Sequence, residues 1–419
     1  MSRFVVPAAA RSWVKVAADS DFPIQNIPFG LAAPKGRNES VVAAIGDQAV
    51  DLCVLAEAGL IDDDEFPILD SFIELGEDRL RALRQVVFEL LVDSNESLRD
   101  NKKVREAAFL PISKANLQVP IPPNAFVDFY SGIYHASNVG KMFRPDQPPL
   151  LPNYKWVPIG YNGRASSVYA SGSKIVRPKG QTKGANDEPP VFGPTKEMDF
   201  ELEMGFYVSH GQDPSKRITT TAAEEHMLGL VIVNDWSARD VQRWEYQPLG
   251  PFLAKSFGTT VSPWIVTLDA LEPFRVVGLE QEPAPLPYLR AHGKPQFDIE
   301  LEVWLQSSKM SSPQLVCRSN MKHLYWSLSQ QLAHQTSNGT PVEFGDLYAT
   351  GTISGPEEGT YGSMLELSWR GQQPLTLDET GEKRTFLEDG DTVTMRAYAQ
   401  GDGFRVGFGD CLGTIAPAL

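Results

Sequence analysis

The sequence predicts a mainly β protein with some α-helix, in which a small N-terminal domain precedes a larger C-terminal domain. Alternation of polar and apolar residues at 199–206 and 298–303 is typical of strands. Beyond residue 126, glycine or proline interrupts the chain about every ten residues, as turns between short strands require. A proline-rich segment with little charge, residues 110–126, separates the two parts. We therefore expect domains at residues 1–118 and 119–419.

The composition favours a small molecule as the partner of this chain. The chain has 419 residues, of which 42% are hydrophobic, as is ordinary for a globular protein of two or three domains. Its formal net charge is −15 and it contains no basic stripe, so a nucleic acid or an anionic membrane would be repelled. No apolar run approaches the roughly 18 residues that a membrane span needs.

The cysteines indicate a reducing compartment. Cys53, Cys317 and Cys411 are odd in number, far apart and never in a Cys-x-x-Cys spacing. This pattern suggests neither a disulfide framework nor a thiolate metal site. Because the N-terminal residues also lack the sustained apolar stretch of a secretory signal, we expect a cytoplasmic protein.

The N-terminal domain is predicted to be a small β-rich unit with attached helices. Residues 41–52 form two short apolar runs around Gly46 and Asp47, which predicts a hairpin that turns at this pair. Further along, apolar residues recur at helical spacing at Leu80, Leu83, Val87, Leu90 and Leu91.

In the C-terminal domain, clear helices are expected only near residues 221–233 and 319–334. Thr221 and Glu224 have the spacing of a capping box, in which the two side chains bond to the backbone of the first helical turn. A shorter helix is predicted to begin after residue 237, within the stretch 234–264 described below.

Asp128, Tyr130 and His135 are the first candidate chemical groups along the chain. Histidine is the side chain most often used for proton transfer near neutral pH. A single histidine beside aromatic residues is, however, more often a structural residue than a catalyst. These three residues therefore need support from other parts of the chain.

The strand predicted at residues 199–206 places three carboxylates on one face, those of Asp199, Glu201 and Glu203. Carboxylates at this spacing repel one another unless they face water or a cation, and oxygen ligands suit a hard ion such as Ca²⁺ or Mg²⁺. A solvated strand face is the alternative. The same pattern recurs at Asp298, Glu300 and Glu302, so we expect that one of the two strands has a solvated face.

Residues 234–264 place acidic, basic and amide side chains among six aromatic residues. Ser237 is predicted to cap a short helix on which Arg239 and Gln242 share a face, and Lys255 follows a Pro-Leu-Gly-Pro break. A guanidinium, an amide and an ammonium could then converge on one acceptor. The alternative is a folded core with satisfied salt bridges.

Common catalytic motifs are absent from this sequence. The chain contains no P-loop, no Gly-x-Gly-x-x-Gly between a strand and a helix, and no Gly-x-Ser-x-Gly or His-Glu-x-x-His. Catalysis would therefore depend on carboxylates, histidine and a metal.

Four blocks of sequence resemble the fumarylacetoacetate hydrolase family. They are residues 128–144, 199–206, 234–264 and 351–369, and the resemblance extends over nearly the whole chain. It implies an N-terminal SH3-like barrel, a C-terminal catalytic domain of the β-roll type, and a homodimer. It also implies metal-dependent hydrolysis of the carbon–carbon bond of 4-fumarylacetoacetate, a diketo acid, to fumarate and acetoacetate, the last step of tyrosine and phenylalanine degradation. The N-terminal extension up to Val14 and the loop at residues 35–40 depart from the family pattern.

The resemblance also implies roles for individual residues. The implied ligands of a Ca²⁺ or Mg²⁺ ion are Asp128, Glu201, Glu203 and Asp235. A second cation site is implied at Asp235, Lys255 and Thr259. His135 with Glu366 is the implied catalytic pair, and Arg239, Gln242 and Lys255 would donate hydrogen bonds to the oxyanion. The implied substrate contacts are Tyr130, Arg144, Tyr161, Gln242, Tyr246 and Thr352.

Two other functions remain open at this stage. A related metal-dependent enzyme that decarboxylates, hydrates or isomerises an oxo acid would keep the acidic residues but would not need a water-activating pair, so His135 and Glu366 favour hydrolysis. A protein that binds Ca²⁺ or Mg²⁺ without turnover would have no use for Arg239, Gln242 and Lys255 beside the metal.

Overall fold

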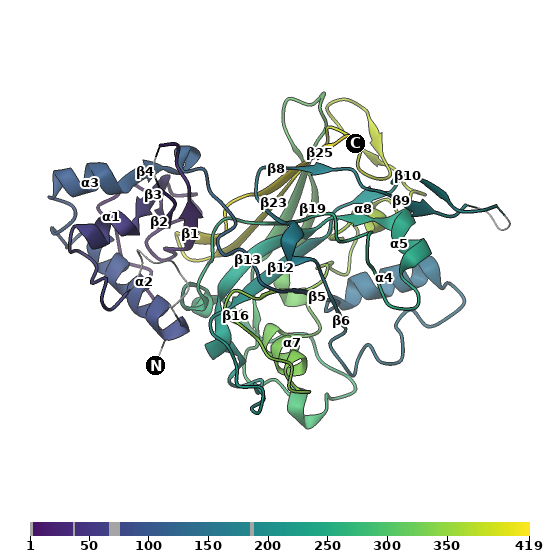
Figure 1. The fold of residues 1–419 in the computed structure, drawn as a ribbon, viewed down its shortest axis with the longest axis horizontal. Coiled ribbons are helices and arrows are strands. Elements are labelled where there is room, and N and C mark those ends of the chain that lie inside the picture. Colours follow the sequence, from purple (N-terminus) through teal and green to yellow (C-terminus); the bar gives the residue numbers. More distant parts are fainter. Residues whose placement is uncertain (1–2, 37, 67–75, 185–187) are drawn as a thin grey trace.

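The structure, a computed structural model, describes residues 3–36, 38–66, 76–184 and 188–419. The N-terminal domain lies at one end of the long axis (Figure 1). The hairpin of β9 (Lys179–Thr182) and β10 (Val191–Pro194) projects at the other end. The predicted fold class, mainly β with some α-helix, is confirmed. Within the described ranges, no helix is both long enough and apolar enough to cross a membrane.

The N-terminal domain is built on a four-stranded antiparallel sheet. Its strands are β1 (Phe29–Ala32), β2 (Ser40–Ile45), β3 (Gln48–Asp51) and β4 (Phe109–Pro111), and its helices are α1 (Leu52–Glu57), α2 (Glu77–Leu91) and α3 (Lys102–Ala108). The hairpin predicted at Gly46 and Asp47 is confirmed as the β2–β3 connection, and the predicted helical spacing is confirmed in α2. No helix or strand covers residues 115–125, where the domain boundary is predicted.

A seven-stranded sheet forms the central layer of the molecule. Its order is β6 (Gly160–Asn162), β5 (Phe126–Phe129), β20 (Leu347–Ala349), β12 (Leu202–Val208), β13 (Met227–Asp235), β15 (Thr259–Val261) and β7 (Val168–Ala170). Along β13, Leu230 and Ile232 pack into the core of the C-terminal domain, whereas Val231 and Val233 pack against the N-terminal domain. Both faces of this sheet are therefore buried at β13.

A six-stranded sheet closes the other side of the C-terminal core. Its order is β19 (Gln314–Asn320), β18 (Glu300–Gln306), β23 (Thr392–Gln400), β25 (Cys411–Ala416) and β8 (Ser173–Val176), with β24 (Arg405–Gly407) paired to β23. Apolar side chains of β18 and β23, such as Leu301, Val303 and Met395, meet those of β12 and β13 in one cluster. This packing fixes the two sheets against each other and supports the strand ends that carry the site.

Short elements connect the two sheets. The two-stranded ribbons are β11 (Met198–Asp199) with β14 (Ser237–Ala238), β16 (Arg275–Val276) with β17 (Gln296–Phe297), and β21 (Leu375–Thr376) with β22 (Lys383–Arg384). The helices are α4 (Ile133–Phe143), α5 (Arg239–Glu245), α6 (Leu268–Leu271), α7 (Leu328–Gln335) and α8 (Met364–Leu367).

The helix predicted at residues 221–233 is wrong. The chain forms one 3₁₀ turn (Ala223–His226) and then enters strand β13, which is buried along its whole length. A strand that is covered on both faces has a continuous apolar run rather than an alternating one, and such a run cannot be told from a buried helix by its periodicity. The capping box is also wrong, because the Thr221 hydroxyl bonds to Thr219 and Glu224 pairs with Arg275.

Two further helix predictions need correction. Ser237 does not cap α5, because it belongs to β14 and its hydroxyl donates to the carbonyl of Asp235 at 3.0 Å. Ala238 occupies the cap position without a side-chain bond. The helix predicted at residues 319–334 is shorter than expected: α7 begins after Ser327, which forms a capping box with Gln330, and ends at Gln335.

Candidate active site

One cavity of about 410 Å³ gathers most of the predicted site residues. It is lined by Asp128, Tyr130, His135, Arg144, Tyr161, Glu201, Arg239, Gln242, Tyr246, Lys255 and Thr352. The other predicted residues, Glu203, Asp235, Thr259 and Glu366, form the layer behind this wall and are fully or almost fully buried. A larger hollow of about 780 Å³ between the domains contains none of the predicted residues.

Four carboxylates meet where three strands of the central sheet end or begin. Asp128 lies on β5, Glu201 immediately precedes β12, Glu203 lies on β12, and Asp235 ends β13. One oxygen of each lies within 4.8 Å of the others, and all four residues are buried. β12 and β13 are neighbours and β20 separates β12 from β5, so strand order brings together residues that are more than 100 positions apart. The interpretation of residues 201–203 as a solvated face is wrong.

Gly351 positions Glu203 from the neighbouring strand end. Its N–H donates to Glu203 Oε2 at 2.9 Å, and its φ of +77° lies in the left-handed region that favours glycine. A Cβ at this position would approach the carbonyl oxygen of Phe129 to 2.3 Å. Glycine is therefore required for this backbone to reach the carboxylate.

Glu201 is the most strongly paired of the four carboxylates. Arg239 Nη1 lies 2.7 Å from its Oε1, and the ammonium of Lys255 donates to Oε2. Burial alone would raise the pKa of Glu201, but these two cations lower it to about 2. Glu201 is therefore ionised at neutral pH even without a bound metal.

Asp235 also has protein donors on both of its oxygens. Lys255 Nζ donates to Oδ2 at 2.8 Å, and the Tyr161 hydroxyl donates to the same oxygen at 2.6 Å. Thr259 donates to Oδ1 at 2.9 Å. A protonated ammonium has no acceptor atom, so the Lys255 side chain contributes positive charge rather than a ligand to the predicted second cation site.

Asp128 and Glu203 lack sufficient partners within the described structure. Asp128 Oδ1 and Glu203 Oε1 are buried and accept no hydrogen bond. Burial raises the pKa of both carboxyls well above their ordinary values, and neighbouring carboxylates raise them further. Two buried oxygens that lack donors, beside two carboxylates that are bonded to protein donors, are the arrangement expected of a cation site.

His135 and Glu366 lie together although 231 positions separate them. His135 Nδ1 is 2.6 Å from Glu366 Oε2, and both side chains are almost completely buried. Burial alone would raise the pKa of Glu366, but His135 and the hydrogen bonds of Asn138 and Ser363 hold it below the ordinary value. An ionised Glu366 therefore accepts a hydrogen bond from the N–H of His135 Nδ1, and in this tautomer of the neutral ring Nε2 is the acceptor atom.

The sequence did not reveal the residues that hold Glu366 in place. Asn138 donates to Oε1 at 2.9 Å, and Ser354 and Ser363 donate to Oε2 at 2.9 and 2.8 Å. For two of these three residues, the sequence spacing contained a signal. Asn138 stands three residues after His135 and so shares its helix face, and Ser363 stands three residues before Glu366, the spacing of a helix cap.

Arg144 ends helix α4 at the wall of the cavity. Its Nη2 donates to the carbonyl of Pro149 at 3.0 Å, while its Nε is buried and donates to no described residue. Tyr130 and Thr352 line the same cavity. Gln242 accepts from Arg239 Nη1 at 3.2 Å, as their predicted shared face requires.

The second acidic strand has a different environment. Asp298 is half exposed and pairs with Lys322 at 3.0 Å, and Glu302 accepts from Arg318 at 2.9 Å, an arginine that is itself largely exposed. Asp298 therefore lies near the surface, whereas Glu302 is largely buried. Among the described residues, the carboxylates that gather closely enough to hold a metal ion are the four of the acidic cluster and not those of this strand. The expectation that one acidic strand faces solvent therefore fits Asp298 but not Glu302.

Buried carboxylates that lack donors, beside a buried histidine–carboxylate pair in one cavity, define an enzyme site of the acidic metal-binding class. Family models match both parts of the chain: fumarylacetoacetase N-terminal over residues 25–120 and fumarylacetoacetate hydrolase C-terminal over residues 125–416. The chain belongs to the fumarylacetoacetate hydrolase family. The resemblance inferred from the sequence is thereby confirmed.

Curated relatives are similar over almost their full length. The chain is 48% identical to a fumarylacetoacetase of Bos taurus over 417 residues, which cover 97% of this chain and 99% of the relative. It is also 48% identical to a fumarylacetoacetase of Homo sapiens, with the same coverage, and 46% identical to one of Oryza sativa over 424 residues, with 98% of each chain covered.

Solved structures share the fold at low sequence identity. A fumarylacetoacetate hydrolase from psychrophilic Exiguobacterium antarcticum has a TM-score of 0.50 and 18% identity, with 93% of this chain and 99% of that chain covered. A putative HpcE protein from Mycobacterium smegmatis has a TM-score of 0.52 and 19% identity, with the same coverage.

Proposed function

We propose that this chain is a fumarylacetoacetase, which hydrolyses 4-fumarylacetoacetate to fumarate and acetoacetate. Near-identical length and 48% identity to curated fumarylacetoacetases support this activity. The single structural observation that carries it is the His135–Glu366 pair at the wall of the cavity, on which Asp128 and Glu201 of the acidic cluster also lie. A base that activates water is needed for hydrolysis, whereas a decarboxylase or an isomerase on the same scaffold does not need one.

The acidic cluster fits a hard divalent cation. Its ligand set would be Asp128, Glu201, Glu203 and Asp235, which offer only oxygen atoms. The unpartnered oxygens of Asp128 and Glu203 would gain a partner, and the raised pKa values of both carboxyls would fall. We infer Ca²⁺ or Mg²⁺, which prefer oxygen ligands. When bound, the cation supplies Lewis-acid stabilisation of negative charge on the oxygens of a 1,3-diketone.

His135 acts as the general base in this mechanism. Its Nε2 takes a proton from water while the water oxygen attacks the carbonyl carbon of the fumaroyl group. The bond between this carbon and the methylene carbon then breaks, and the electron pair passes to the acetoacetate fragment. That fragment takes the proton back from His135, and fumarate carries the water oxygen. Glu366 keeps the ring in one tautomer and stabilises the imidazolium, as the acid does in a Ser-His-Asp triad.

Arg239 and Lys255 stabilise the oxyanion that forms during attack. Both line the cavity, and Arg239 Nη2 is buried and donates to no described residue. Gln242 keeps the guanidinium in place through its bond to Nη1. Preorganised donors of this kind act mainly on the transition state, because the charge that they face develops only there.

The first testable consequence concerns these two donors. Arg239→Leu and Lys255→Met should each lower kcat by about 10²–10³-fold and change KM by less than about threefold. Steady-state kinetics on variants with a wild-type circular dichroism spectrum would measure both constants. A rise in KM at unchanged kcat would instead make these residues binders of the ground state.

Arg144 binds a carboxylate of the substrate together with Tyr130. Its unpartnered Nε offers a charge-assisted hydrogen bond, which contributes about 1.5–3 kcal/mol when it forms. Tyr161 already donates to Asp235, so it supports the cation site and contacts the substrate from there. Tyr246 and Thr352 complete the wall of the cavity.

The second testable consequence separates this binding from catalysis. Arg144→Leu should raise KM by about 10–100-fold and change kcat by less than about fivefold, since the contact is made equally in ground and transition states. Arg370→Leu is a matched control, because Arg370 stacks on Phe143 of the same helix but does not line the cavity. An unchanged KM in Arg144→Leu, or equal changes in both variants, would refute the role of Arg144.

The proposal includes a homodimer in the cytoplasm. The buried thiols of Cys317 and Cys411 form no disulfide, which supports a reducing compartment. Light scattering of the purified protein should give twice the mass of one chain, and a mass of one chain would contradict the dimer.

Product analysis tests the proposed function. The purified protein with Mg²⁺ or Ca²⁺ should convert 4-fumarylacetoacetate to equal amounts of fumarate and acetoacetate, followed by nuclear magnetic resonance. Reaction in ¹⁸O-labelled water should place one label in a fumarate carboxylate. Release of carbon dioxide, or an isomer without water uptake, would support one of the related activities instead.

A further inference from the structure

Asp199 is a fully buried carboxylate that none of the roles described above uses. It ends strand β11 and lies two residues before Glu201, but it does not belong to the cluster of four carboxylates. Its side chain accepts four hydrogen bonds, all from groups of the protein: from Arg239 Nε, and from the backbone N–H groups of Phe200, Met364 and Leu365. Such a fully bonded carboxylate has no free position for a ligand.

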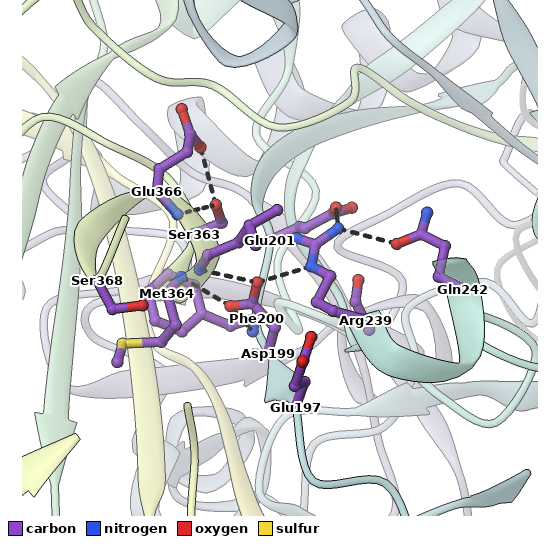
Figure 2. Close-up of polar contacts among 12 residues, drawn as sticks. Glu197, Asp199, Phe200, Glu201, Arg239, Gln242, Ser363, Met364, Glu366 and Ser368 are labelled. Atoms are coloured by element: carbon purple, nitrogen blue, oxygen red, sulfur yellow. Dashed lines mark hydrogen bonds and ion pairs between the residues drawn. The ribbon is translucent and has the colours of Figure 1, made fainter. Parts of the chain in front are cut away.

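The partners of Asp199 belong to the two halves of the catalytic apparatus (Figure 2). Its Oδ2 accepts from Arg239 Nε at 2.7 Å and from Leu365 N at 3.1 Å, and its Oδ1 accepts from Met364 N at 2.7 Å. Arg239 begins α5 and reaches the oxyanion side of the cavity. Met364 and Leu365 begin α8, the four-residue helix that carries Glu366.

We infer that Asp199 is a positioning residue that fixes Arg239 relative to the helix carrying Glu366. The inference rests on the proposed function, in which both residues act on one substrate. A planar carboxylate bonded at both oxygens holds its partners in fixed directions. Because α8 has only four residues, side-chain bonds to its N–H groups add to the core packing of Met364 and Leu365 in fixing its orientation. A misplacement of about 1 Å can cost about 100-fold in rate, so a link between the oxyanion donor and the base has kinetic consequences.

Asp199→Asn tests the link. An asparagine that keeps its oxygen toward Met364 and Phe200 would point its amide group at two other donors, Arg239 Nε and Leu365 N. The substitution should lower kcat by about 10–100-fold and leave KM within about threefold, because the site would be assembled but misaligned.

A double-mutant cycle distinguishes positioning from general support of the fold. In the Arg239→Leu background, Asp199→Asn should cost less than about threefold in kcat, because the group to be positioned is already gone. A residue that only stabilises the fold would cost the same factor in both backgrounds.

Glu197→Gln provides a matched control. Glu197 lies two residues before Asp199 and also binds an arginine of α5, Arg243, at 2.5 and 2.8 Å. That pair is partly exposed, with side-chain exposures of 22% and 31%, against 0% and 5% for Asp199 and Arg239. Glu197→Gln should therefore change kcat by less than about threefold.

The outcomes separate the inference from the proposed function. An inactive wild type overturns both. Two results with an active wild type overturn only the positioning role. One is an Asp199→Asn variant with unchanged kcat, and the other is an equal loss of kcat from Asp199→Asn in the wild-type and Arg239→Leu backgrounds. If circular dichroism shows that Asp199→Asn does not fold, Asp199→Glu is used instead under the same criteria. The glutamate keeps the charge but displaces the carboxylate by one methylene group.

Discussion

Replacing His135 by glutamine should lower kcat by about 10³–10⁴-fold, in the upper part of the range for general acid–base catalysis. His135 is buried and lines the cavity, and its Nδ1 is bonded to Glu366. Its Nε2 is therefore the atom that takes a proton from water. Glutamine fills a similar volume but cannot accept that proton. Ca²⁺ binding measured by calorimetry should remain, because His135 is not one of the four carboxylates of the acidic cluster.

The partner of His135 provides the control for this prediction. Glu366→Gln should also lower kcat severely, because the amide of glutamine favours the wrong tautomer of the imidazole. Since the two residues act as one unit, the double variant should be scarcely slower than His135→Gln alone. Losses that multiply in the double variant would show that another group activates the water.

Replacing Glu203 by glutamine should abolish metal-dependent turnover. Glu203 offers a buried oxygen without a partner, and its loss removes one of four charges that would hold the cation. Affinity for Ca²⁺ should fall by more than about 100-fold, beyond the effect of losing a residue that merely supports a ligand. The variant should still fold, because burial already raises the pKa of Glu203 and the cation-free site tolerates a neutral side chain.

Thermal unfolding tests the same prediction without an activity assay. At about 100 times its dissociation constant, Ca²⁺ stabilises a folded protein by about 2.7 kcal/mol, so the wild type should show a raised Tm that a chelator reverses. Glu203→Gln and Glu201→Gln should lose this rise. Glu302→Gln and Glu300→Gln, in the second acidic strand, should keep it. Equal losses in both strands would refute the assignment of the cation site.

Local signals in the sequence predicted the N-terminal domain better than the central sheet. The β2–β3 hairpin and helix α2 depend on a turn pair and on helical spacing, both of which are local. Strand β13 was mistaken for a helix because both of its faces are buried, one by the C-terminal core and one by the N-terminal domain. Burial on the second face is a property of the assembled molecule, and no window of sequence contains it.

The site illustrates the same limit. Alternation placed Glu201 and Glu203 on one strand face, but only the resemblance to a family joined them to Asp128 and Asp235, and His135 to Glu366. These residues converge through strand order and through the docking of α4 against α8, which spacing does not encode. In the sequence, Asp199 looked equivalent to Glu201. In the structure it ends β11, which belongs to a separate two-stranded ribbon, and there it bonds to Arg239 and to the N-terminus of α8.

Fumarate release before and after removal of metal tests the central claim most directly. Purified protein should form fumarate from 4-fumarylacetoacetate, lose this activity after exhaustive chelation, and regain it when Mg²⁺ or Ca²⁺ is added back. Glu203→Gln should not be rescued by the same addition. Full activity in protein from which metal has been removed, as measured by elemental analysis, would contradict the assignment of the acidic cluster to a catalytic cation.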